Sequence, residues 1–379
     1  MAEGTGVLDL VTGASRHVGT YFNVLSGLTS VVIVGFPALL LASGAPTRRP
    51  SMGLLGHHLH TAFGLGTIAA FGVLIFVTGI TVHPLQFGMT QILEGYWGHG
   101  RLQRLAMSRC ERRHMATFWA LMDSDKRAQI ELDEIDAKLG TVATQRRVAQ
   151  SSPLSSWDRF WRRLTLRPPP GSITDLEERE RELLRKSIEP NVVLETDGMA
   201  EDRYPARADE ILPTRLGNVL RRHERLAGAR FKLDAVTVTP YVSLVAEAPE
   251  SNYLDDTRSA MDLPIRMVLV WALCTLEGVF LLWQYDFWLG VPLLTYVLAY
   301  LAYRGAVSAA SDYGNALGVV LTLGRRNLYE RLNIDFPPDL DTERQNNPEL
   351  DRLLAGGYGQ VQFTASPAFK AQQKRWRLW

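Results

Sequence analysis

One acidic residue within an otherwise apolar stretch is the first candidate for chemistry. Glu277 stands between Arg266 and Asp286, with no other charged residue in that interval. A carboxylate in the hydrocarbon of a bilayer is costly, so it must be protonated, paired or turned toward a polar cavity. Three interpretations stay open: an interhelical hydrogen bond, a position on a proton or ion path, and exposure to lipid with local thinning of the bilayer. Candidate partners on other segments are Ser26, Thr29, Arg48, His60, Thr67 and Thr78.

Histidine residues offer a weaker candidate. His57, His58 and His60 would supply three imidazole ligands of the kind that bind Zn²⁺ or Cu²⁺, but no carboxylate or thiolate accompanies them in sequence. The chain contains no phosphate-binding loop, no nucleophile elbow and no paired-histidine zinc motif. We therefore predict no catalytic residue, no cofactor and no metal site beyond these three weak candidates.

An acidic segment from Asp123 to Glu134 has part of the spacing of a calcium-binding loop. Arg127 occupies a position that would have to supply a ligand, and Ala128 replaces the glycine that the turn requires. A cation in that position repels Ca²⁺. The segment is therefore predicted to be an ordinary acidic helix.

Aromatic and arginine side chains suggest contacts with a lipid surface. Trp157, Phe160 and Trp161 recur at helical spacing, and Arg162 and Arg163 point to another side of the same helix. This composition is typical of a helix in the headgroup layer, with rings at the acyl boundary and guanidinium groups on anionic lipid. The alternative is a helix that packs on its own domain. Four further rings stand where a headgroup boundary is expected, namely Tyr96, Trp97, Trp283 and Trp288.

The distribution of charge predicts a membrane protein. Charged residues are absent between Arg16 and Arg48 and again between Arg49 and Glu94, although acidic and basic residues nearly balance over the whole chain. A spanning helix needs about 20 apolar residues. The first such segment resembles a cleaved signal, yet its apolar run is longer than a signal core, so we predict an uncleaved anchor. The four predicted spans are 21–42, 61–83, 263–283 and 287–303.

The placement of arginine predicts the orientation of these spans. Arginine residues follow the second span, precede the third and follow the fourth, whereas the other side has only Arg48 and Arg49. Both termini and the middle of the chain are therefore expected in the cytoplasm, with the spans in the inner membrane of a bacterium. The expected organisation is a cytoplasmic N-terminus (1–20), a first transmembrane hairpin (21–83), a cytoplasmic domain (84–262), a second hairpin (263–303) and a cytoplasmic helical extension with a tail (304–379).

The cytoplasmic domain is predicted to be rich in α-helix with one short β element. We expect the second span to continue as helix through 91–122, and a basic amphipathic helix to place His223 in a core or at its boundary. Alternating β-branched residues over 235–245 favour a short strand pair. Small residues from Ala306 to Gly318 predict a helix face suited to close packing. The fold class expected is mainly α: a four-span, two-plus-two transmembrane protein with an α-rich cytoplasmic domain.

Three short strings resemble a group of actinobacterial-type, multi-pass membrane proteins to which no activity is assigned. They are Leu93–Trp97, Pro213–Asn218 and Leu233–Ala235, and arginine far outnumbers lysine in the chain, as in such sources. The order of two spans, a cytoplasmic helical insertion and two more spans also resembles bestrophin-type anion channels, in topology alone. The first resemblance implies an integral membrane protein, and the second implies only an arrangement of spans.

The first function that these features predict is a non-enzymatic anchor, scaffold or sensor for cytoplasmic partners. It would contact anionic membrane lipids and assemble as a homo-oligomer or within a protein complex. Two alternatives stay open: an oligomeric ion channel or ion-coupled transporter that uses Glu277, and a membrane enzyme with an unrecognised site. The formal net charge of +1 argues against a nucleic-acid partner.

Overall fold

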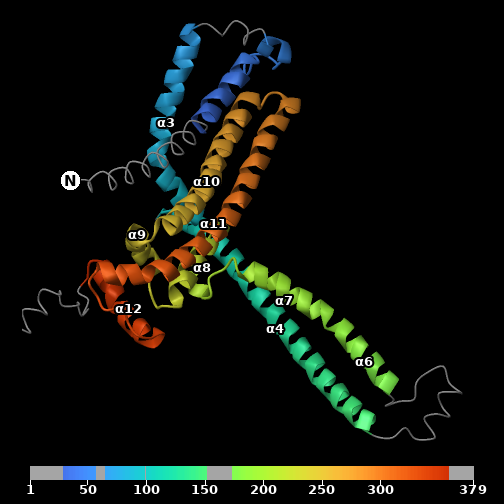
Figure 1. Ribbon diagram of the computed structural model, residues 1–379. Coiled ribbons are helices and arrows are strands. Elements are labelled where there is room, and N and C mark those ends of the chain that lie inside the picture. The colour runs from blue at the N-terminus through green and yellow to red at the C-terminus, as the bar shows by residue number, and fades with distance from the viewer. Residues whose placement is uncertain (1–28, 57–64, 99, 152–172, 358–379) are drawn as a thin grey trace, which may run out of the picture. The chain divides into compact units, whose positions relative to one another are not determined.

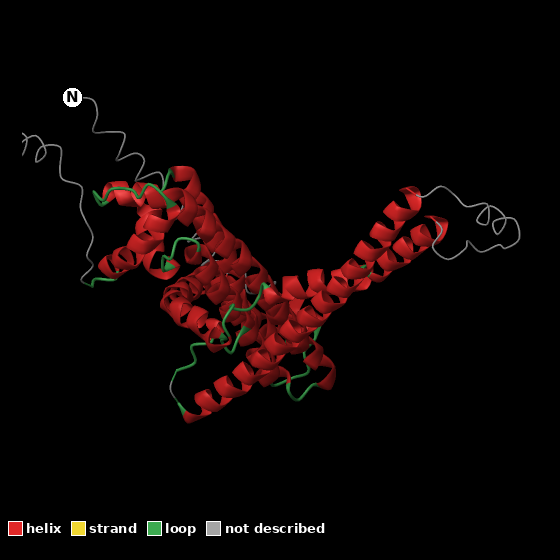
Figure 2. Cartoon of the chain, turned by 90° about the horizontal axis from the view of Figure 1, so that it is seen from below, coloured by secondary structure: helices red, strands yellow, loops and turns green. Residues whose placement is uncertain are grey.

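A computed structural model describes residues 29–56, 65–98, 100–151 and 173–357 of the chain. These residues are mainly helical, and no strand occurs among them, as Figure 2 shows. They divide into two compact units, one formed by 108–211 and the other by the described residues before 108 and after 211. The mainly α-helical fold class is thus confirmed for the described residues.

The larger unit is built around a hairpin of two long helices, α10 (Ala248–Leu282) and α11 (Gly290–Arg331), joined by the 3-10 turn η2 (Asp286–Leu289) (Figure 1). By length and composition, this hairpin provides two helices able to cross a membrane. Three other apolar helical stretches in the described chain are shorter, namely Thr29–Ala42, Ala69–Val82 and Ala235–Val245. The described residues therefore contain two helices that are both long and apolar enough to span a membrane, where four spans were predicted.

Large apolar side chains cover the outside of the hairpin and of α3 (Leu65–Glu94). Phe280 is 76% exposed and Phe287 is 89% exposed, and on α3 Phe76 is 68% exposed. A soluble protein rarely leaves a continuous surface of this kind to water, because each such side chain gains about 1.5–3 kcal/mol on burial. Hydrocarbon is the environment that suits this surface.

The α10–α11 hairpin is held by polar and small side chains between its helices. The hydroxyl groups of Thr275 and Thr295 are hydrogen-bonded at 2.9 Å. Ala306 and Ala310 are fully buried, which confirms the predicted small-residue face of α11. Near the turn, helix Thr29–Ala42 joins the hairpin in a cluster of buried and half-buried side chains; its members are Phe36, Leu40, Ala45, Leu281, Leu282, Tyr285, Trp288 and Val291.

Helix α3 stops at Glu94, so the prediction of one continuous helix through 91–122 is wrong. Gly95 has a φ of +107°, and the N–H groups of Gly95 and Tyr96 both donate to the carbonyl of Gln91, at 3.1 and 2.8 Å. This left-handed glycine is the common way to end an α-helix. A second helix, α4 (Arg101–Ser151), begins after Gly100, whose N–H donates to Gln103 Oε1 at 2.7 Å.

The predicted β element at 235–245 is also wrong, because these residues form helix α9 (Ala235–Val245). Its three buried residues, Ala235, Val238 and Val242, are three and four positions apart, and this spacing fits a helix that packs one face on α11. The hydroxyl of Thr239 donates to the carbonyl of Ala235 at 2.5 Å, as threonine does within helices. Burial of one face therefore outweighs the alternating β-branched pattern.

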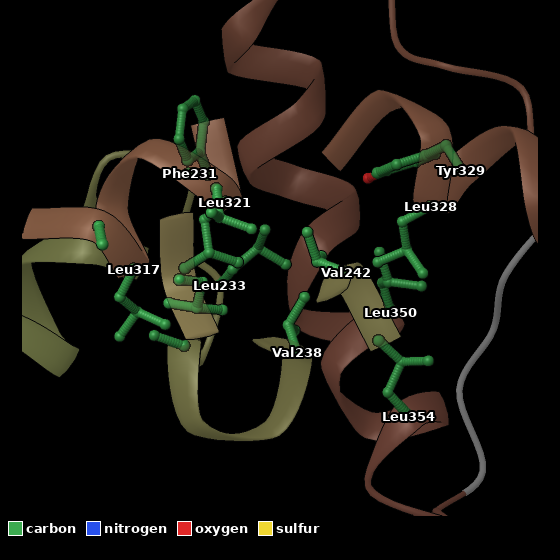
Figure 3. Close-up of a cluster of buried hydrophobic side chains, with 14 of the residues drawn as sticks. Phe231, Leu233, Val238, Val242, Leu317, Leu321, Leu328, Tyr329, Leu350 and Leu354 are labelled. Carbon is green, nitrogen blue, oxygen red and sulfur yellow. The ribbon is translucent and has the colours of Figure 1, made fainter. Parts of the chain in front are cut away.

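Helices α9, α11 and α12 (Leu340–Leu354) enclose the main hydrophobic core of the larger unit. Figure 3 shows Val238 and Val242 of α9 beside Leu321 and Leu328 of α11 and Leu350 of α12. The core also includes residues of the loop that leads from α8 (Arg215–Ala229) into α9. The C-terminal half of α11 is therefore the element on which this core assembles.

The smaller unit is a helical arm built from α4 beyond its first turns, α6 (Ile173–Lys186) and α7 (Ile188–Glu201). The buried residues of α4 are Phe118, Ala128, Ile135 and Val142, and the last three repeat every seven positions. A seven-residue repeat is typical of coiled-coil packing. The arm is also fixed by Arg146, which contacts Glu180 at 2.8 Å and Glu177 at 3.2 Å.

The acidic segment from Asp123 to Glu134 lies within this arm and is helical throughout, which confirms the prediction of an ordinary acidic helix. Asp123 forms an ion pair with Arg127, four residues later on the same helix. A calcium loop needs a sharp turn that α4 does not make here.

Candidate functional site

Glu277 lies on α10, on a helix side that is half-buried in the larger unit. Its Oε2 atom is enclosed by the protein and has no hydrogen-bond partner among the described residues. Cys274, one turn earlier, is fully buried. Of the candidate partners, Ser26 and His60 fall outside the described residues, as does the side chain of Thr67. No partner for Oε2 is supplied by Thr29, Arg48 or Thr78, which the structure describes.

A second group of ionisable residues, which sequence reasoning missed, gathers where α3 meets α8. We call it the inner junction and define it by Glu94, His223, Glu224 and Tyr313. Gly217 of α8 packs on the backbone carbonyl of Glu94, so closely that no Cβ atom would fit. The junction is therefore a contact between the backbones of two helices, with carboxyl groups beside it.

Burial and repulsion act together on the two carboxyl groups of the inner junction. Burial, followed by the nearby charge of Glu224, raises the pKa of Glu94 from 4.5 to about 7. Burial also raises the pKa of Glu224, although Arg221 and Arg225 oppose that effect. The Glu94 carboxyl group therefore takes up and releases a proton near neutral pH.

Aromatic side chains fix α8 against α11 at the same place. The hydroxyl of Tyr303 accepts hydrogen bonds from the backbone N–H groups of Arg215 and Leu216, at 3.2 and 3.4 Å. The ring of His223 lies against Gly314 of α11, where a Cβ atom would collide with it. His223 is thus in a helix–helix contact, as predicted for a core or boundary histidine.

The position of the inner junction along α10 and α11 follows from its apolar neighbours. Leu93, at the end of α3, packs on a cluster that contains Ile265 of α10 and Ala306 of α11. Ile265 lies beside Arg266, which is the last charged residue of α10 before Glu277, so it stands at the start of the apolar part of this helix. The carboxyl groups of Glu94 and Glu224 therefore lie where the apolar part of the hairpin gives way to its charged continuation.

The four aromatic residues expected at headgroup boundaries lie at two places in the described chain. Trp283 and Trp288 flank the turn between α10 and α11, and Trp283 is 65% exposed. Tyr96 and Trp97 follow the end of α3, where the indole N–H of Trp97 donates to the carbonyl of Ile92 at 2.7 Å. These two places are opposite ends of the apolar helices, as an aromatic belt requires.

The remaining candidates fall outside the described residues and stay predictions. They are the interfacial group Trp157, Phe160, Trp161, Arg162 and Arg163, and the imidazole group His57, His58 and His60. Among the residues that the structure does describe, no group of three or more His, Cys, Asp or Glu is placed to hold a metal ion.

Buried polar side chains of the larger unit bind the protein's own backbone. The Asn218 side chain accepts from the N–H of Leu212 at 2.6 Å and donates to its carbonyl at 2.9 Å. Asn347 of α12 accepts from the Tyr329 hydroxyl at 2.5 Å and donates to the Phe231 carbonyl at 2.6 Å. Such groups hold loops and helix ends in place. Nothing in the sequence pattern indicates the role of Asn347, because its bonds join residues that only the fold brings together, whereas Asn218 and Leu212 are six positions apart in sequence.

The chain was compared with models of protein families, with curated proteins and with solved structures, and none of them matches it.

Proposed function

We propose that this protein is an integral membrane protein that anchors and organises cytoplasmic partners and catalyses no reaction itself. Helices α10 and α11 form one transmembrane hairpin, and 21–42 with 61–83 form the other. Both termini and the arm lie in the cytoplasm, and the membrane is the inner membrane of a bacterium. The exposed apolar surfaces of α3, α10 and α11 support the membrane assignment.

One observation carries the scaffold assignment: besides the buried residues that pack its helices together, the arm has a row of exposed apolar side chains. Leu184, Ile188 and Val192 follow one another at intervals of four residues and are 51%, 59% and 54% exposed. Four-residue spacing aligns them on one side of α6 and α7. An apolar row on an anchored helical arm is suited to pack on another helix, from a second copy or from a partner protein.

The experiment is to measure assembly of the full chain in lipid nanodiscs and in detergent by mass photometry. We expect an oligomer, or a complex recovered with a co-expressed partner, that dissociates when Leu184, Ile188 and Val192 are changed to Ser. Replacing Leu226 of α8, which is also 51% exposed, by Ser is the matched control and should leave assembly intact. A wild-type chain that stays monomeric and captures no partner contradicts the scaffold function.

A second candidate function rests on the Oε2 atom of Glu277, which is enclosed and has no hydrogen-bond partner within the part of the chain that the structure describes. An ion channel or ion-coupled transporter would use this carboxyl group within the bilayer. Ion flux into proteoliposomes should then be measurable and should change in Glu277→Gln, whereas Glu131→Gln on the exposed surface of α4 should leave it unaltered. A wild-type protein without flux under any gradient of protons or ions eliminates this candidate.

A further inference from the structure

The corner between α3 and α4 presents apolar and basic side chains together. Leu102 is 82% exposed and Leu105 is 67% exposed, although both belong to the first turns of a helix. Arg101 and Arg104 are exposed as well. On an α-helix, each pair at i and i+3 shares one side, so the leucines form one stripe and the arginines form the adjoining stripe.

The position of this corner follows from the end of α3. Leu93 packs on the cluster that contains Ile265 and Ala306, which places it at the inner end of the apolar hairpin. Only the short link from Gly95 to Gly100 separates α3 from α4. That link carries Tyr96, 51% exposed, and Trp97. The first turns of α4 therefore begin within a few residues of the boundary between hydrocarbon and headgroups.

We propose that the first turns of α4 bind the headgroups of anionic lipids in the inner leaflet. Leu102 and Leu105 enter the acyl boundary, and the guanidinium groups of Arg101 and Arg104 contact lipid phosphates. This inference rests on the proposed membrane anchoring and deepens it, since it names the lipid class and the residues that select it. All the residues that make this interaction lie at the corner between α3 and α4, so the proposal does not depend on residues 152–172.

Two observations favour lipid over a protein partner as the occupant. The corner is continuous with a helix whose outward surface is already apolar, because Phe76 and Ile80 of α3 are 68% and 61% exposed. The side chains that adjoin the leucines are cationic, and the cytoplasmic leaflet is the anionic one. Long arginine side chains also allow the charge to reach phosphate while the aliphatic stem stays on apolar surface.

The first test measures depth with an environment-sensitive fluorophore on single cysteines in the full-length protein. The background is Cys110→Ser, since Cys274 is fully buried and closed to a bulky label. Labels replace Leu102, Phe280 and Leu244. Leu244 is the matched control because it is a leucine with 85% exposure on α9. α9 packs against α11 near Gly324, which is about 27 Å along the helix from Ala306 at 1.5 Å per residue.

Spin-labelled lipid in nanodiscs that contain anionic lipid should quench the labels at 102 and 280 several-fold more than the label at 244. If the label at 280 is quenched and the label at 102 is not, the proposal that the first turns of α4 bind lipid is wrong, while the proposed membrane anchoring remains supported. If the label at 280 is not quenched, both the lipid-binding proposal and the proposed membrane anchoring are wrong. The label at 102 could instead be unquenched by spin-labelled lipid and shift its emission when the protein self-associates. That result identifies a second copy as the occupant and overturns the lipid assignment.

The second test measures which lipids surround the protein. In nanodiscs with mixed headgroups, Arg101→Gln and Arg104→Gln should each reduce the preference for anionic over zwitterionic lipid by about fivefold, the factor that corresponds to about 1 kcal/mol per basic residue near the surface. The control is the pair Lys126→Gln and Arg147→Gln, both exposed farther along α4. An unchanged lipid preference in the Arg101/Arg104 variant overturns the proposal.

Discussion

Gly217 on α8 packs directly on the backbone carbonyl oxygen of Glu94, the last residue of α3, and leaves no space for a side chain between the two helices. Only glycine permits this approach, because any Cβ atom would overlap the carbonyl group. The same contact places the Glu94 carboxyl group near Glu224. Close backbone packing and the proximity of two half-buried carboxyl groups are therefore two consequences of one glycine.

Replacing Gly217 by Ala should weaken the attachment of α8 to α3. The added methyl group forces the helices apart, and overpacking of this kind typically costs about 1–3 kcal/mol. Thermal unfolding in detergent measures the effect. Gly140→Ala is the control, since nothing lies within 4 Å of the Cβ position on the exposed surface of α4 and alanine favours a helix there. Equal stability of the two variants contradicts the close contact.

Stability should fall as pH rises through the range set by Glu94. Its pKa is 4.5 when free and about 7 in the folded protein, so between these values the folded state holds a proton that the unfolded chain has released. The stabilisation of the folded state by this proton is therefore fully present below about pH 4.5 and is lost as the pH rises through about 7.

Glu94→Gln should flatten this part of the pH profile and raise the melting temperature at pH 8. Melting temperatures at pH 5, 6, 7 and 8 for the wild type, Glu94→Gln and the exposed control Glu131→Gln provide the comparison. A profile for Glu94→Gln that declines as steeply as that of the wild type shows that another group is responsible.

Asn347 should be essential for the attachment of α12, because its amide links Tyr329 of α11 to the carbonyl of Phe231. Asn347→Ala leaves both partners buried without a hydrogen bond, at a cost of about 1–3 kcal/mol for each unsatisfied group. Asn346→Ala, next to it and exposed, should have little effect. Hydrogen exchange read along α12 separates the two outcomes, with faster exchange expected only in Asn347→Ala.

The arm should open at its end when Arg146 is reversed in charge. Arg146→Glu replaces contacts of 2.8 and 3.2 Å to Glu180 and Glu177 by repulsion. Each side chain is about one-third exposed, so the loss is modest, on the order of 1 kcal/mol. Adding Glu180→Arg to Arg146→Glu should restore protection against limited proteolysis. Failure of the double variant to recover would assign the effect to something other than charge.

Much of the fold was predictable from local composition. The apolar run before Trp283, the small-residue face of α11 and the charged continuation beyond it are properties of neighbouring residues, and each was confirmed in the described chain. The residues 235–245 were mistaken for strand because alternation of β-branched residues is a weak local preference. Burial of Val238 and Val242 outweighs this strand preference, and the residues of α11 and α12 that pack on them are far away in sequence. The end of α3 is marked in the sequence by Gly95, Gly98 and Gly100, because glycine residues favour the end of a helix over its continuation.

The amino-acid sequence by itself determined where apolar helices run and where charge is excluded, since both depend on residues within one or two turns of each other. Only the tertiary structure decided that Glu94 lies near Glu224, that Asn347 joins Tyr329 to Phe231, and that Oε2 of Glu277 is enclosed without a partner among the described residues. Each of these depends on the distance between helices that are remote along the chain. That distance is set by glycine contacts and side-chain packing, which no local pattern encodes.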